Sequence, residues 1–273
     1  MKKPPKVDAQ ALFLRVMAGL GAYRDGVVLV GGFARDLYRN MDGFADLALR
    51  PPATNDIDFA VNDPLQIFGD RHLHDILLQA GLQHRAQTGL DHRTLGCVYF
   101  PAELTNPRPT DPHVEFVTPL RGPDRDRNAQ PQRDDLFAFT LRFIDLLLDD
   151  PASVADPILG RVRIPHPLAY VVQKTRIRTK RLEERKAAKD QADAFFVIVS
   201  LQSIWDDWRA RWDQIAQHQE QGAWLRETQR LWTDLYRSPT SPGAREVASA
   251  YPEYSPDIVC RIMAEFQETF LRR

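Results

Sequence analysis

Two aspartates in the segment NDIDFAV, Asp56 and Asp58, are the first candidates for chemistry, and they alternate with Ile57, Phe59 and Val61. This alternation predicts a strand that presents both carboxylates on one face and the apolar side chains on the other. Carboxylates about 7 Å apart along a strand repel each other, so a hard cation such as Mg²⁺ is expected beside them. The alternative, which stays open, is that Asp56 is only a turn residue and that Asp58 is a solvent-exposed residue on an edge strand.

Glu115 is a third carboxylate, placed in the run PHVEFVTP between Val114 and Phe116. If this run forms a strand beside the one with Asp56, Glu115 joins the same acidic face. Three carboxylates can hold two metal ions about 3.5 to 4 Å apart, which is the arrangement used for in-line displacement at phosphorus. A surface glutamate on an amphipathic strand is the alternative.

Two glycines, Gly31 and Gly32, follow the apolar run VVLV and precede the helix-compatible FARDLY. The order strand, glycine turn, helix offers backbone N–H groups and the positive end of a helix dipole to a phosphate. Close packing in a tight strand-to-helix turn explains the same two glycines equally well.

The chain divides into two parts with different patterns of secondary structure, and the first part must position these residues. From residue 27 to 119, short β-rich runs alternate with helix-like stretches such as 63–81, whereas strands almost vanish after Leu136, apart from a possible short one at GRVRIP. The segment 118–135 is polar and reads as a surface loop. We therefore expect an α/β (α+β) fold, with a mixed sheet and flanking helices over 1–150, followed by a mainly helical domain over 151–273. The tryptophans sit at helical spacings and predict a bundle core.

Composition excludes several classes. The 273 residues contain 36 Lys and Arg against 37 Asp and Glu, so an electrostatic partner must be recognised by a local patch. Cys97 and Cys260 lie far apart without a CxxC companion, which argues against a disulfide framework or a zinc site. Apolar runs are too short for a signal peptide or a membrane span. We expect a soluble, cytoplasmic protein without a membrane partner.

A basic series lies in the segment KTRIRTKRLEERKAAKDQAD, with spacings of four, three, four and four. Its members are Lys174, Arg178, Arg181, Arg185 and Lys189. On one continuous helix they would form a stripe that faces something anionic. The alternative is a solvated face that is partly screened by Glu183 and Glu184.

These motifs resemble a known superfamily. VGGFARD with the downstream DIDFAV resembles motif A of the DNA polymerase β-like nucleotidyltransferases, in the Gly-Gly and Arg-Asp form familiar from tRNA CCA-adding enzymes. KDQAD beside AFFVIV resembles the Lys-Asp-x-x-Asp helix start of nucleotidyltransferases of type IV toxin–antitoxin systems. The resemblance covers most of the span from residue 27 to 199.

The resemblance implies transfer of a nucleoside monophosphate from an NTP, such as ATP, with release of pyrophosphate. It implies two Mg²⁺ ions, or Mn²⁺, held by Asp56, Asp58 and Glu115, an RNA acceptor such as tRNA, and an antitoxin partner. The implied nucleotide-binding residues are Gly31, Gly32, Arg35, Lys174, Arg178, Arg185, Lys189, Asp190 and Asp193, the last two orienting the lysines. Two alternatives stay open, namely a small-molecule (antibiotic-type) nucleotidyltransferase and a non-catalytic nucleotide- or partner-binding protein of the same fold.

Overall fold

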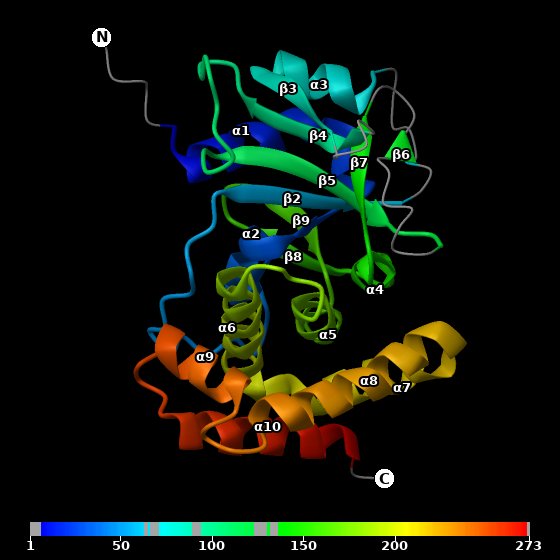
Figure 1. Cartoon of the computed structure of the whole chain (residues 1–273). Coiled ribbons are helices and arrows are strands. Elements are labelled where there is room, and N and C mark those ends of the chain that lie inside the picture. The colour runs from blue at the N-terminus through cyan, green and yellow to red at the C-terminus, as the bar shows by residue number, and fades with distance from the viewer. Residues whose placement is uncertain are drawn as a thin grey trace. The chain divides into compact units, whose positions relative to one another are not determined.

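The computed structural model forms two compact units, coloured along the chain in Figure 1. The structure describes residues 7–62, 65, 71–88, 94–122, 130–131 and 136–271. The first unit comprises Met1–Leu37 and Ala53–Pro165, and the second comprises Tyr38–Pro52 and His166–Arg273. The division of the chain into domains at residue 150 stays a prediction. Each unit is described by itself.

The first unit is built on a mixed sheet, as the sequence predicts. Its strands are β1 (Val27–Val30), β2 (Asp56–Val61), β3 (Leu82–Thr88), β4 (Thr94–Pro101), β5 (His113–Pro119), β6 (Gln130–Pro131) and β7 (Phe137–Leu141). Their order is β1-β2-β5-β4-β3, with β7 pairing with β5 and β6 with β7. The pairs β2–β5 and β5–β7 are parallel and the others are antiparallel. A separate hairpin joins β8 (Ala152–Asp156) to β9 (Gly160–Ile164).

Helices cover this sheet. They are α1 (Ala9–Leu20), α2 (Gly31–Leu37), α3 (Leu73–Gln79) and α4 (Ile144–Leu148), with the 3₁₀ turn η1 (Gly21–Asp25) after α1. The Asp8 side chain caps α1 by accepting a hydrogen bond from the Gln10 amide at 3.2 Å. Helix α1 packs on α3, α2 packs on β2, and α4 packs on β5. Ile57, Phe59 and Val61 are fully buried, so the alternation of β2 separates apolar from acidic side chains as expected.

The second unit is helical. Its elements are η2 (Tyr38–Asn40), α5 (Pro167–Arg178), α6 (Glu184–Ser200), η4 (Gln202–Ile204), α7 (Trp205–Gln217), α8 (Gln219–Tyr236), α9 (Pro242–Ala250) and α10 (Pro256–Leu271). Trp208 and Trp232 are each 1 % exposed and pack their rings against Phe266 of α10. The Trp232 indole also donates a hydrogen bond to the Thr175 hydroxyl at 2.9 Å. The tryptophan spacing therefore marks bundle core, as predicted.

Three local expectations need correction. The short strand expected at GRVRIP is present as β9, but two further strands follow Leu136, since β7 joins the main sheet and β8 pairs with β9. Part of the predicted loop 118–135 is also extended, since β5 runs to Pro119 and β6 lies within it. A β-carbon on Gly96 would lie 2.6 Å from the Phe139 ring, so β7 packs where a distant glycine leaves room, which no local pattern reveals. Only Leu73–Gln79 of the predicted helix 63–81 is helical, and residues 63–64 and 66–70 lie outside the described residues.

Across the described ranges, none of the helices combines the length and the apolar character that crossing a bilayer requires.

The helical unit offers a matched test of its core. Leu225 of α8 is 2 % exposed, whereas Leu182 is fully exposed. We expect Leu225→Ala to lower the free energy of unfolding by about 2 to 5 kcal/mol, because it removes buried methyl groups and leaves a cavity. Leu182→Ala should change it by less than about 0.5 kcal/mol. Urea unfolding followed by tryptophan fluorescence measures both, and equal effects would contradict the assignment of α8 to the core.

Candidate functional site

The turn from β1 into α2 is built around the side chain of Asp58. Val30 pairs with Asp58 across the antiparallel β1–β2 ladder, and Gly31 follows with φ +69°. A β-carbon on Gly31 would collide with Oδ2 of Asp58, and one on Gly32 would lie 2.6 Å from Cβ of Thr54. The close approach of Asp58 to Gly31 and of Thr54 to Gly32 therefore requires both glycines. Phosphate binding is not needed to explain them.

The acidic face forms as the sequence predicts. In the parallel β2–β5 ladder Asp58 pairs with Glu115, and Asp56 pairs with His113. Paired residues of neighbouring strands lie on the same face, about 4.8 Å apart along the hydrogen-bonding direction. Asp56 is exposed, while Asp58 and Glu115 are half-buried. The structure therefore brings the three carboxylates to one face of two adjacent strands.

His113 is a member of this face that the sequence analysis missed. Its Nε2 lies 3.2 Å from Oε1 of Glu115 and 3.8 Å from Oδ1 of Asp56, and its Nδ1 lies 2.7 Å from the Asp111 carbonyl oxygen. Burial alone would lower the pKa of His113, but the hydrogen bonds to Glu115 and Asp111 and the two carboxylate charges raise it to about 9. The signal was present in HVEF, because residues two apart in a strand share a face.

A protonated His113 supplies the cation that the acidic face was expected to need. Carboxylate repulsion by itself therefore does not require a metal ion here. The donor chemistry still fits one, since Asp56, Asp58 and Glu115 offer hard oxygen ligands on a shared, partly exposed face. Among the described residues, no three His, Cys, Asp or Glu side chains converge closely enough to form a ready-made metal cluster. Their role as metal ligands stays a prediction.

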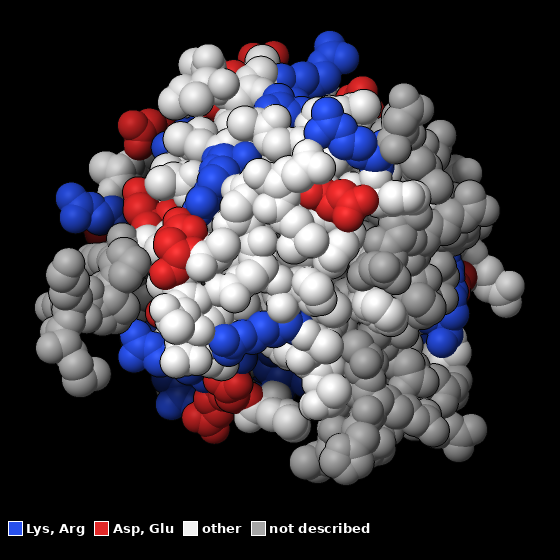
Figure 2. Space-filling model, turned by 90° about the horizontal axis from the view of Figure 1, so that it is seen from above, with Lys and Arg blue, Asp and Glu red and all other residues white. Residues whose placement is uncertain are grey.

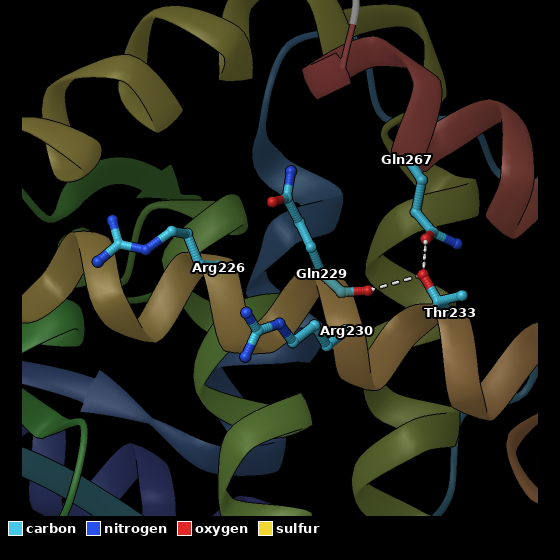
Figure 3. Close-up of a pocket in the computed structure, with 5 residues that line it drawn as sticks. All are labelled: Arg226, Gln229, Arg230, Thr233 and Gln267. Carbon is cyan, nitrogen blue, oxygen red and sulfur yellow. Dashed lines mark hydrogen bonds between the residues drawn. The ribbon is translucent and has the colours of Figure 1, made fainter.

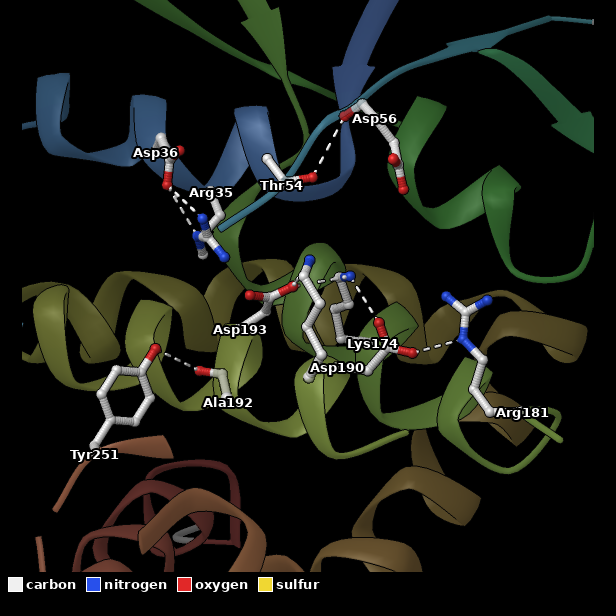
Figure 4. Close-up of polar contacts among 11 residues, drawn as sticks. Arg35, Asp36, Thr54, Asp56, Lys174, Arg181, Asp190, Ala192, Asp193 and Tyr251 are labelled. Carbon is white, nitrogen blue, oxygen red and sulfur yellow. Dashed lines mark hydrogen bonds and ion pairs between the residues drawn. The ribbon is translucent and has the colours of Figure 1, made fainter. Parts of the chain in front are cut away.

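Arg35 and Asp36, the Arg-Asp pair of α2, contact each other. The Nε and Nη2 atoms of Arg35 lie 2.9 Å and 2.7 Å from Oδ1 of Asp36. Arg35 is 1 % exposed. Figure 4 shows this pair beside Thr54 and Asp56 of the same unit. The contact fixes the guanidinium, and its predicted part in nucleotide binding stays a prediction.

The second group of predicted residues lies on α5 and α6 of the helical unit (Figure 4). Nζ of Lys174 lies 2.8 Å from Oδ1 of Asp190 and 3.2 Å from Oδ2 of Asp193. Lys189 contacts Asp193 at 3.2 Å, and Nε of Arg181 contacts Asp190 at 2.8 Å. The two aspartates thus contact Lys174, Lys189 and Arg181. The contact of the two lysines with NTP phosphates remains untested.

The ion pairs of Lys174 with Asp190 and Asp193 are buried, which affects the charge state of the lysine. Lys174, Asp190 and Asp193 are 7 %, 2 % and 0 % exposed. Burial alone would lower the pKa of Lys174, but the charges of Asp190 and Asp193 outweigh it and raise that pKa. Lys174 is therefore charged at neutral pH and is tied to two carboxylates.

The predicted stripe on one continuous helix is wrong. Helix α5 ends at Arg178 and α6 begins at Glu184, so the five cations lie on two helices and their connection. The Thr179 hydroxyl donates to the Arg176 carbonyl at 2.8 Å, and Glu184 enters the first turn of α6, where a negative charge suits the helix dipole.

The cations of this segment face anions of the chain itself. Arg178 binds Glu246 of α9 through Nη2 at 2.5 Å and Nε at 3.3 Å, in a bidentate arrangement. Glu246 is a second residue that sequence reasoning missed, and a separation of 68 residues left no local signal for it. Arg185 is exposed and makes no ion pair with any described residue.

The buried network predicts a stability effect. Lys174→Met should lower the free energy of unfolding by about 3 to 5 kcal/mol, because it leaves two buried carboxylates without their shared cation. Lys186→Met is the matched control, since Lys186 is 58 % exposed and, among the described residues, pairs only with Glu183 at the surface. The control should cost less than about 1 kcal/mol. Urea unfolding of both variants measures this, and a Lys174→Met protein as stable as the control would refute the network's role.

Comparison with known proteins identifies a family for this chain. A family model described as Nucleotidyltransferase matches residues 9–217, which is more than half of the chain and includes both groups of predicted site residues. Neither the curated proteins nor the solved structures contain a significant match. The matched span holds the strand, glycine turn and acidic face of the first unit together with the buried Lys174 network. The chain belongs to the nucleotidyltransferase family.

Proposed function

We propose that this protein is a Mg²⁺-dependent enzyme that transfers a nucleoside monophosphate from an NTP to an RNA acceptor, tRNA being the preferred candidate, and releases pyrophosphate. The observation that carries the proposal is the register that pairs Asp58 with Glu115 and sets Gly31 against Asp58. Family membership supports nucleotidyl transfer in general. The RNA acceptor and an antitoxin partner rest on the resemblance of the KDQAD helix start.

The reaction assigns a part to each residue. An acceptor hydroxyl oxygen attacks the α-phosphorus of the NTP, the bond from that phosphorus to the bridging oxygen breaks, and pyrophosphate leaves. Glu115 accepts or orients the proton of the attacking hydroxyl. Asp56, Asp58 and Glu115 would hold the divalent ions, which when bound neutralise charge on the triphosphate. His113 lies on the same face and keeps the carboxylates compensated before substrate arrives.

The second unit would contribute cations that are already oriented. Lys174 and Lys189 each contact Asp193, so their side chains are fixed before any ligand binds. A triphosphate would therefore find them with little further loss of side-chain freedom.

The central test is which molecule gains label from an α-³²P-labelled NTP in the presence of Mg²⁺ and total RNA. We expect label in RNA, and Asp58→Asn should lower transfer more than about a hundredfold, because several kcal/mol of charge stabilisation is lost. Asp75→Asn, an exposed aspartate of α3, is the control and should transfer normally. Normal transfer by Asp58→Asn would end the proposal, and label in a small molecule would move the acceptor to the antibiotic-type class.

The glycine turn gives an independent test with a close control. Gly31 and Gly160 have φ of +69° and +73°, but a β-carbon on Gly160 would meet nothing within 4 Å. Both Gly→Ala variants should lose about 1 to 2 kcal/mol of stability from the left-handed backbone. Only Gly31→Ala displaces the Asp58 carboxylate, so only it should lower transfer, by roughly a hundredfold. Equal transfer rates for the two variants would show that the position of Asp58 is not critical.

A further inference from the structure

Helix α8 carries a second set of cations that the sequence analysis did not single out. Arg226 and Arg230 lie on α8, and Arg237 directly follows its last residue. At 3.6 residues per turn the three lie within about 40° of one another around the helix axis, and Arg226 and Arg230 are separated by about 6 Å along it. All three are exposed.

These arginines have no close ion-pair partner among the described residues, and Arg230 interacts only more weakly with the charge of Glu227. No described residue forms an ion pair or a side-chain hydrogen bond with the guanidinium of Arg226, Arg230 or Arg237. Glu227, the neighbour of Arg226 in the sequence, is engaged by Arg176, whose Nη1 lies 2.7 Å from its Oε1. Arg176, with lesser help from Lys180 and Arg230, lowers the pKa of the Glu227 carboxyl, so that anion stays charged and paired elsewhere.

The same helix face borders an open pocket of about 310 Å³, shown in Figure 3. It is lined by five polar residues, Arg226, Gln229, Arg230 and Thr233 of α8 and Gln267 of α10, which also contribute the apolar atoms of their side chains. The Thr233 hydroxyl donates to the Gln229 carbonyl at 3.0 Å, and Gln267 donates to the Met263 carbonyl at 3.0 Å, which holds the pocket edge in place. The side-chain amide of Gln229 is left as a further donor beside the two guanidinium groups.

The charges on the face seen in Figure 2 are mixed, and most cations of the segment 174–189 are paired within the chain. On the face seen in Figure 2, basic and acidic side chains are interspersed with uncharged ones. Lys174, Arg178, Arg181 and Lys189 are bound to internal carboxylates. Arginine side chains that have no anion of their own and line a pocket of hydrogen-bond donors match phosphate groups in geometry and charge.

We propose that Arg226, Arg230 and Arg237 bind the phosphate backbone of the RNA acceptor, which rests on the proposed function. RNA fits this face better than a protein partner does, since protein interfaces centre on apolar and aromatic side chains. The large apolar side chains exposed in the described residues are Leu47, Leu78, Ile158 and Leu182, and none of them belongs to α8 or α10.

The test measures binding of fluorescein-labelled bulk tRNA by anisotropy over a series of salt concentrations. Arg226→Gln/Arg230→Gln removes two charges and keeps good helix formers. We expect this variant to bind roughly five- to tenfold more weakly at low salt, with a salt slope that is shallower by about 1.4 log units per log unit of salt. Arg245→Gln/Arg261→Gln removes two exposed arginines of α9 and α10 outside the pocket and should behave like wild type.

Circular dichroism confirms that both variants are folded, and NTP incorporation into total cellular extract is measured in parallel. Equal tRNA affinity and slope for the two double variants would overturn the inference. Failure of wild type to bind tRNA at low salt would also overturn it, and continued labelling of a different acceptor would then show that nucleotidyl transfer itself survives. Loss of transfer with retained, α8-dependent tRNA binding would leave the inference standing while the proposed reaction fails.

Discussion

The parallel pairing of β2 with β5 is the constraint on which the acidic face depends. The apolar sides of the two strands fix it, because Phe59 stacks on Phe116 with ring centroids 5.6 Å apart. A slip of one residue would carry Asp58 to the opposite face, since side chains alternate with a period of two. Hydrophobic burial on one face of the sheet thus sets the position of the carboxylates on the other, and the antiparallel β1 then delivers Gly31 against Asp58.

In both units, groups of like-charged side chains lie beside a side chain of opposite charge. His113 compensates the acidic face, and Lys174 compensates two buried aspartates. Such buried pairs add little net stability, because desolvation offsets much of their attraction, but losing one partner is costly. Under the proposed function, the two aspartates would orient Lys174 before a polyphosphate binds, and the polyphosphate would have to compete with these carboxylates for its charge.

The sequence was sufficient for features that depend on local periodicity. It predicted β2, β5, the glycine turn, the mixed sheet and the tryptophan core, because each is written in spacings of two or three to four residues. It failed where a contact joins distant segments. Strand β7 needs the space above Gly96, and Arg178 finds Glu246 on another helix, so neither could be read from its neighbours in the chain. His113 is different, because its place on the acidic face follows from the spacing of two in HVEF.

The two arginine-bearing segments of the helical unit show why charge periodicity cannot identify a binding face. Residues 174–189 and 226–237 both repeat cations at helical spacings, and from sequence the first is the denser and more persuasive. The folded structure gives the opposite order. Asp190, Asp193 and Glu246 form ion pairs with cations of the first segment, whereas Glu227 of the second segment pairs with Arg176. Whether a cation is available to a phosphate therefore depends on whether a carboxylate of the chain already pairs with it. Tertiary packing decides that pairing.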